Sequence, residues 1–172
     1  DDDPTGSQAV HSCLLLLRWD VQALRRGLRH GSPLLFVLAD TRSLTPDAAA
    51  QRNREIVTNL EVALMEEGLD RSEIQLVSRG DSTLRGHGVV EPAVLERCFG
   101  PFAATLHVPA FIEGGRTTVN GVHLLHGEPV HTTPFAKDRL FGFSTSYLPN
   151  WLEQKSAGAI CAADVVKVSL ED

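Results

Sequence analysis

The sequence lacks a long hydrophobic run and a basic N-terminal segment. No apolar stretch approaches the ~20 residues that are needed to cross a bilayer. The chain begins with three aspartates, whereas a signal peptide would begin with basic residues. We therefore expect neither a membrane span nor a targeting segment. Because the chain opens on Asp1 without an initiator methionine, we also expect the natural sequence to begin upstream.

Cysteine is scarce, and positive charge is outnumbered by negative charge. Cys13, Cys98 and Cys161 are an odd number, lie far apart and form no CxxC pair, which argues against a disulfide framework or a thiolate zinc site. This usage indicates a reducing cytoplasm. The formal net charge of −6 repels polyanions and anionic lipids, so we expect neither a nucleic-acid partner nor a membrane partner. An anionic ligand would need a few placed arginines or backbone N–H groups.

What is present is an ordinary globular composition in a chain of 172 residues, of which 42% are hydrophobic and 22% are charged. This length suits one well-buried core, so we predict a single domain over residues 1–172. Strand-length apolar runs alternate with helical patterns, which predicts a three-layer αβα fold with a mostly parallel, Rossmann-like sheet. The expected strands are 14–19, 34–39, 74–77, 105–109 and 165–170, the hairpin is 117–130, and the expected helices are 20–30, 46–68, 91–98 and 146–154.

Four polar segments fall in the loops of this pattern. They are DDDPTGS at 1–7, Thr41-Arg42-Ser43, RGDSTLRG at 79–86, and Gly114-Gly115-Arg116. Sites in parallel sheets lie beyond the carboxyl ends of the strands, so we expect these loops to share one crevice at one edge of the sheet. Carboxylates can accept a proton from a hydroxyl, and guanidinium groups can hold a carboxylate with two bonds. A small polyhydroxy acid needs both.

Each segment also has a simpler interpretation. Asp-Pro-Thr-Gly is a common turn sequence, Gly114-Gly115 suits a turn, and Arg42 alone could form a surface ion pair of little value. The segment 79–86 is more specific, because Asp, Ser, Thr and two arginines lie close together after an expected strand. There the functional interpretation is the stronger one.

In their order along the chain, these motifs resemble the four-carbon acid sugar kinase family. DDPTGS at 2–7 is similar to the DDxTG start of the family, and DSTLRG at 81–86 is identical to its signature. VPAF at 108–111, Gly115-Arg116, Gly121, Gly127 and FAKD at 135–138 follow its VPAF…GR…G…G…FAxD pattern. The resemblance spans nearly the whole chain.

The resemblance implies the substrate-binding half of an ATP-dependent kinase that acts on a four-carbon sugar acid such as threonate or erythronate. Asp3 and Asp81 are the candidates that orient or deprotonate the attacking hydroxyl, and Arg85 and Arg116 are the candidates that hold the carboxylate. The substrate-binding set that the resemblance implies is Asp2, Arg42, Ser82, Thr83, Arg85 and Arg116, with no metal ligand.

The family resemblance also implies what this chain does not contain. Family members carry a C-terminal nucleotide-binding domain, which supplies the ATP and Mg²⁺ site, and a strand that precedes the DDxTG start. This sequence lacks a counterpart of either one. We therefore expect the chain alone neither to bind ATP tightly nor to phosphorylate a substrate. An interdomain face left uncovered would favour self-association into a homo-oligomer.

Two alternatives remain open at this stage. Asp1-x-Asp3-x-Thr5 has the DxDxT spacing of phosphatases in which the first aspartate attacks phosphorus, although the expected strand and the later acidic pair are missing. The chain could also be a non-catalytic sugar-acid-binding module or a kinase remnant. A metal site at His123, His126 and His131 is disfavoured because this spacing does not converge on a hairpin, so we expect solvent-exposed or substrate-facing histidines.

Overall fold

The computed structural model describes residues 1–169, apart from the side chains of Gln8 and Ala9. These residues have a mixed α/β structure with one small parallel sheet and one small antiparallel sheet. They group into two compact units, which we describe separately. Unit 1 contains residues 1–80 and 86–105, and unit 2 contains residues 81–85 and 106–169. The assignment of residues 1–172 to a single domain stays a prediction.

Unit 1 contains three α-helices, and local capping sets the first residues of two of them. Helix α1 (Val21–Leu28) begins after Asp20, whose carboxylate accepts a hydrogen bond from the backbone N–H of Ala23 at 3.0 Å. Helix α2 (Pro46–Glu67) begins after Thr45 with proline at its first position, and helix α3 spans Val90–Phe99. The helix predictions for this unit are therefore confirmed.

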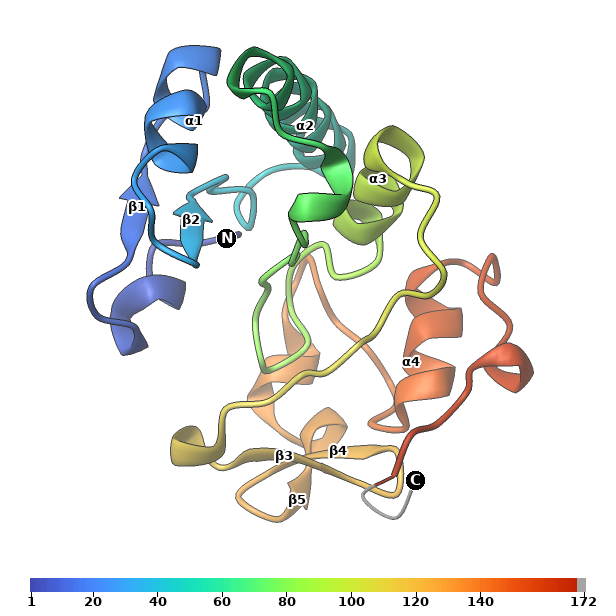
Figure 1. Ribbon diagram of the computed structural model, residues 1–172. Coiled ribbons are helices and arrows are strands. Elements are labelled where there is room, and N and C mark those ends of the chain that lie inside the picture. Colours follow the sequence, from blue (N-terminus) through green and yellow to red (C-terminus); the bar gives the residue numbers. More distant parts are fainter. Residues whose placement is uncertain (170–172) are drawn as a thin grey trace. The chain divides into compact units, whose positions relative to one another are not determined.

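The core of unit 1 lies between these helices. Helix α2 packs against both α1 and α3 and runs between them in Figure 1. The buried side chains that form this core are Leu24, Val57, Leu60, Ala63, Leu64 and Phe99. The helical spacing of apolar residues in α2 is what delivers four of these six side chains to one face.

Two strands of unit 1 pair in parallel. Strand β1 (Leu14–Leu16) and strand β2 (Leu35–Val37) form a ladder in which Leu14 pairs with Leu35. Helix α1 connects them, as parallel pairing requires. Both strands were predicted, and both are shorter than the apolar runs that contain them.

Three predicted strands are wrong. Residues 74–77, 105–109 and 165–169 form no ladder with any strand of the described chain, and Leu170 lies outside the described residues. Val77, Leu106 and Val166 in these segments are 71%, 76% and 85% exposed. An apolar run becomes a strand only where a neighbouring strand supplies hydrogen-bond partners, and sequence alone does not name that neighbour. The three-layer, Rossmann-like arrangement therefore stays a prediction.

Unit 2 is built on the predicted hairpin. Strands β3 (Arg116–Val119), β4 (Val122–Leu125) and β5 (Glu128–Pro129) form an antiparallel sheet in that order. At the β3–β4 turn, Asn120 and Gly121 have φ values of 51° and 79°, the left-handed pair that a type I′ turn requires. The asparagine-glycine signal in the sequence therefore fixes this register.

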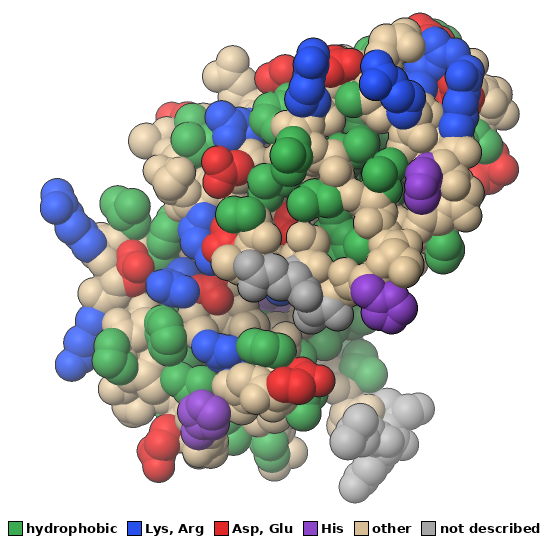
Figure 2. All heavy atoms as spheres, turned by 90° about the vertical axis from the view of Figure 1, so that its left-hand side faces the viewer, with side chains coloured by type: hydrophobic (Ala, Val, Ile, Leu, Met, Phe, Trp, Pro, Cys, Tyr) green, Lys and Arg blue, Asp and Glu red, His purple; other side chains and the backbone are tan. Residues whose placement is uncertain are grey.

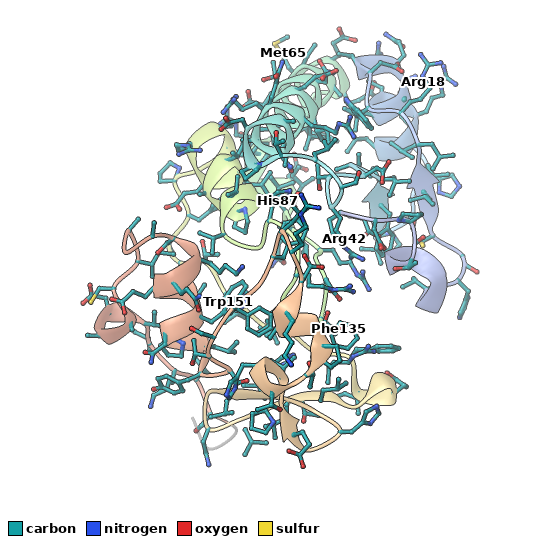
Figure 3. All side chains as sticks on the ribbon, turned by 180° about the vertical axis from the view of Figure 1, so that it is seen from behind. Arg18, Arg42, Met65, His87, Phe135 and Trp151 are labelled. Carbon is teal, nitrogen blue, oxygen red and sulfur yellow. The ribbon has the colours of Figure 1, made fainter. Side chains whose placement is uncertain are left out.

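Helix α4 (Leu148–Lys155), which was also predicted, completes unit 2. Trp151 projects from α4 into the interior of its unit (Figure 3) and is 1% exposed. It belongs to the core of this unit, and the other buried apolar side chains of unit 2 are Leu84, Val130, Ala136, Phe143 and Leu148.

The surface carries charges of both signs. Figure 2 shows basic, acidic and hydrophobic side chains interspersed on the face that it presents. Within the described part of the chain, no helix is both long enough and apolar enough to cross a bilayer.

Candidate functional site

In unit 1, the backbone of the first two aspartates is held on both sides. The backbone N–H of Ala39 donates to the carbonyl of Asp1 at 2.9 Å, and that of Arg42 donates to the carbonyl of Asp2 at 3.1 Å. On the other side, the backbone N–H of Asp2 donates to the carbonyl of Arg79 at 3.1 Å. The acidic segment is therefore fixed between the end of β2 and the end of the 74–79 segment.

Arg42 gathers two of the three carboxylates. Its Nε and Nη2 donate to the two oxygens of Asp2 at 2.9 and 2.7 Å, and its Nη1 donates to Asp3. The side chain of Asp2 is 1% exposed, whereas those of Arg42 and Asp3 are 22% and 18% exposed. The buried Asp2 therefore orients Arg42, while Arg42 and Asp3 keep contact with solvent.

Asp3 is a carboxylate that stays ionised. Burial acts to raise the pKa of Asp3, but hydrogen bonds from the hydroxyl and backbone N–H of Thr5, together with the charge of Arg42, outweigh it and lower the pKa below 3.8. A carboxylate with a lowered pKa is a weak base. Its chemistry at neutral pH is to accept a hydrogen bond and to orient a hydroxyl.

Asp1 does not have the exposure of a nucleophile. Its side chain is fully buried, neither oxygen has a hydrogen-bond partner, and the nearest guanidinium nitrogen, Nη1 of Arg79, lies 3.7 Å away. A phosphatase of the DxDxT type would need this carboxylate to reach phosphorus, so the geometry speaks against that alternative.

The three aspartates are also the residues whose ligand atoms lie close enough, within 4.8 Å, to hold a metal ion in the described chain. They do not fit a Mg²⁺ site as arranged, because Arg42 already supplies the positive charge for Asp2 and Asp3. A magnesium ion would have to compete with a guanidinium that is bonded to both oxygens of Asp2.

Glu91 is a buried residue of this cluster that the sequence did not reveal. It is 5% exposed on α3, where it accepts hydrogen bonds from the hydroxyls of Thr41 and Ser78. These two residues directly precede Arg42 and Arg79, so Glu91 fixes the backbone beside both arginines. Its helical position gave no signal, because a glutamate at the start of a helix usually faces solvent.

Gly86, the last residue of the DSTLRG motif, has φ of +88° and lies against the Asp2 carboxylate. A Cβ at this position would approach Oδ2 of Asp2 to 2.9 Å, and Asp2 is held in place by Arg42. The glycine is therefore required by the close approach as well as by the backbone conformation.

We expect Gly86→Ala to destabilise the chain by about 1–3 kcal/mol, because alanine is strained at this φ and collides with a fixed carboxylate. Urea unfolding curves would measure the change. Gly127→Ala is a matched control, because Gly127 has φ of +86° and an added Cβ would meet no atom within 4 Å. If Gly86→Ala is no less stable than Gly127→Ala, the contact with Asp2 does not contribute to the free energy of unfolding.

In unit 2, the segment Asp81–Arg85 forms a tight loop around one carboxylate. Asp81 accepts hydrogen bonds from the backbone N–H and the hydroxyl of Thr83, and from Nε of Arg85 at 2.6 Å. Burial acts to raise the pKa of Asp81, but the bonds from Thr83 and Arg85 outweigh it and lower the pKa below 3.8. Asp81 is therefore ionised at neutral pH, and Arg85 is its counter-ion.

Two arginines of unit 2 lie over aromatic rings. The guanidinium of Arg85 lies 4.9 Å from the ring centroid of Phe135, and that of Arg116 lies 5.3 Å from the ring centroid of Phe111. Nε of Arg116 is buried and has no hydrogen-bond acceptor. A buried donor without an acceptor is unusual and marks a place for an oxygen atom from a ligand or a water molecule.

One histidine of unit 2 corrects the sequence interpretation. His126 and His131 are exposed, as expected. His123 is 0% exposed, so the expectation of solvent exposure is wrong for this residue. Thr118 contacts one of its ring nitrogens and the carbonyl of Ser82 contacts the other. Burial is the largest of the effects on the pKa of His123, and the net result is a lowered pKa. His123 is buried because its side chain lies on the inward face of β4. The hairpin pattern alone did not specify which face of the strand would be buried.

His107 is half-buried, and its ring stacks on that of Trp151 with ring centroids 5.3 Å apart. Nε2 of His107 and Nε1 of Trp151 are both buried without a hydrogen-bond partner. Burial, with a smaller contribution from His123, lowers the pKa of His107 to about 4. His107 is therefore a neutral side chain at neutral pH.

This pKa predicts a specific loss of stability in mild acid. The folded state binds a proton on His107 less well than the unfolded state, whose pKa is near 6.5, so stability falls as pH falls from 6.5 to about 4. The full loss from this group is about 3 kcal/mol. In His107→Phe, which keeps the ring stack on Trp151, we expect a smaller loss, measured by denaturant unfolding at several pH values. An unchanged pH profile in this variant would contradict the assignment.

The structure brings the predicted site residues together in two groups, one in each unit. Unit 1 contains Asp2, Asp3 and Arg42, and unit 2 contains Asp81, Ser82, Thr83, Arg85 and Arg116. In each group, an aspartate with a lowered pKa lies beside an arginine. The single crevice shared by all four loops, on which the sequence interpretation relied, stays a prediction.

Comparison with known proteins agrees with the motifs. The chain is 28% identical over 145 residues to a protein named D-erythronate kinase from Heliobacterium modesticaldum, and this match covers 80% of the chain. The match spans 31% of the length of that relative. No solved structure matches the chain significantly. Residues 1–171 match the family described as sugar-binding N-terminal domain, which covers the whole set of motifs. The chain belongs to this family of sugar-binding N-terminal domains.

Proposed function

We propose that this chain is the sugar-acid-binding domain of an ATP-dependent kinase, and that its substrate is a four-carbon sugar acid of the threonate or erythronate type. The observation that carries the proposal is the membership of residues 1–171 in the sugar-binding family, together with the intact DSTLRG loop. The similarity to a D-erythronate kinase supports the choice of a four-carbon acid.

The geometry supports a division of roles among the polar residues. Arg116 offers a buried Nε–H without an acceptor, and a substrate carboxylate would supply that acceptor. Arg85 is the second candidate for this carboxylate, because its side chain is 30% exposed and its guanidinium is held in place by Asp81. Ser82 is a further polar residue of the same loop, and Thr83, which is 1% exposed, supports the site through its hydrogen bonds to Asp81. Asp2 and Arg42 form the corresponding pair of unit 1.

Asp3 and Asp81 are the candidates that orient the attacking hydroxyl. Their lowered pKa values suit a group that accepts a hydrogen bond rather than one that keeps the proton. Phosphoryl transfer depends mainly on positioning and charge neutralisation, so an oriented hydroxyl is sufficient. ATP and Mg²⁺ would be supplied by a nucleotide-binding domain in a cytoplasmic protein, and the metal would neutralise charge on the phosphates.

The test is a thermal-shift screen of the chain with D-erythronate and D-threonate. A ligand at 100 times its dissociation constant stabilises by about 2.7 kcal/mol, which corresponds to a rise in Tm of about 5–10 °C for a chain of this size. Erythritol is the control, because it carries the hydroxyls without the carboxylate. Absence of any shift with the four-carbon acids at high concentration would contradict the proposal.

A further inference from the structure

His123 holds the DSTLRG loop from outside the loop. Its Nε2 lies 2.7 Å from the carbonyl oxygen of Ser82, and its Nδ1 lies 2.9 Å from the hydroxyl of Thr118. A carbonyl oxygen can only accept, so Nε2 carries the ring proton and donates it to Ser82. Nδ1 is then the acceptor, and the hydroxyl of Thr118 donates to it.

The hairpin fixes the orientation of this ring. Thr118 and His123 are directly opposite each other in the β3–β4 ladder, so the cross-strand pair places the hydroxyl at Nδ1. The backbone N–H of His123 also donates to the carbonyl of Ser146 at 2.8 Å. The imidazole is therefore held at both nitrogens and through its own backbone, with the side chain 0% exposed.

The other hydrogen bonds that hold this loop lie within it. Thr83 and Arg85 donate to the Asp81 carboxylate, and the backbone N–H of Leu84 donates to the carbonyl of Asp81 at 3.0 Å. Leu84 is 2% exposed and has φ of 67°, a conformation that non-glycine residues seldom adopt. A strained loop of this kind persists only where its surroundings hold it.

We propose that His123 is a positioning residue, which fixes the Asp81–Arg85 loop in the conformation that binds the sugar acid by donating a hydrogen bond to the carbonyl of Ser82. This proposal rests on the proposed function of the same loop. His123 acts through Ser82 and does not itself reach the substrate, because it is fully buried. Thr118 acts through His123, because its hydroxyl at Nδ1 selects the tautomer with the proton on Nε2.

The experiment compares two substitutions of His123 in the 172-residue chain. His123→Phe keeps the ring volume but removes the donor, whereas His123→Gln keeps an N–H near the position of Nε2. We expect hydrogen exchange of the Thr83, Leu84 and Arg85 amides to accelerate at least tenfold in His123→Phe, and the glutamine variant to recover most of the protection. Calorimetry with D-erythronate is expected to show an affinity loss of at least tenfold that follows the same order.

His126→Asn is the matched control, because His126 lies on the same hairpin, is exposed and has φ of 49°, which asparagine tolerates. We expect it to leave both measurements unchanged. If His123→Phe does not fold, Thr118→Val, which releases the Nδ1 partner, is expected to accelerate the same three amides.

Unchanged exchange of the loop amides in His123→Phe would overturn the proposal, and so would a glutamine variant as impaired as the phenylalanine variant. If wild type binds no four-carbon acid, the proposed function fails, while the exchange measurement still decides whether His123 holds the loop.

Discussion

Arg42→Met is expected to destabilise the chain by about 3–5 kcal/mol, because it leaves the carboxylate of Asp2 buried and without its counter-ion. Asp2 is 1% exposed, and Arg42 contributes two hydrogen bonds to it at 2.7 and 2.9 Å. Methionine keeps much of the length of the side chain, so the effect reports the charge and the hydrogen bonds. Denaturant unfolding of the variant and of wild type would measure it.

An exposed ion pair provides the control for Arg42. Arg18 pairs with Asp20 at 3.1 Å, but the two side chains are 83% and 44% exposed, so Arg18→Met is expected to change stability by less than about 0.5 kcal/mol. Adding Asp2→Asn to Arg42→Met removes the buried charge and is expected to recover part of the loss. A stability of Arg42→Met within about 1 kcal/mol of wild type would contradict a buried pair.

The second large effect is expected from Asp81 and Arg85 in a protein that joins this chain to the nucleotide-binding domain of the proposed function. An arginine that holds the substrate carboxylate binds ground state and transition state alike. Arg85→Met should therefore chiefly raise KM, with a loss of about 2–5 kcal/mol in binding free energy. An aspartate that orients the hydroxyl acts as the bond forms, so Asp81→Asn should chiefly lower kcat, by about 10²- to 10⁴-fold.

The ion pair seen between these residues makes the alternative concrete. Nε of Arg85 donates to Asp81 at 2.6 Å, so the pair could serve only to brace the loop. In that case, both variants would lose thermal stability and would change KM and kcat together. Steady-state kinetics with melting curves separates the two cases, and Arg139→Met, which alters an exposed arginine of the same unit, is the control. An unchanged kcat in Asp81→Asn would remove Asp81 from the reaction.

Local signals in the sequence predicted the local structure well. Asp20 and Thr45 cap the helices of the predicted ranges 20–30 and 46–68, and Asn120-Gly121 forms the turn of the predicted hairpin 117–130. These interactions involve residues within three or four positions of each other, so the sequence contains both partners.

The predictions that failed involve partners distant in the chain. The strands expected at 74–77 and 105–109 required neighbours that no local pattern identifies. His123 was expected to be solvent-exposed or substrate-facing. The sequence did not reveal its burial, because that burial depends on contact with Ser82, 41 residues away. Glu91 gave no signal for the same reason, since Thr41 lies 50 residues from it.

The sequence by itself determined the helices, the hairpin turn and the family of this chain, because capping groups, periodicity and the DSTLRG motif are all local patterns. Only the tertiary structure decided which charges neutralise which. It placed Arg42 on Asp2, 40 residues away, and Arg85 on Asp81, and it left Nε of Arg116 buried without an acceptor. Burial and pairing set the pKa of a carboxylate and the availability of a guanidinium, and both depend on the neighbours that folding brings together.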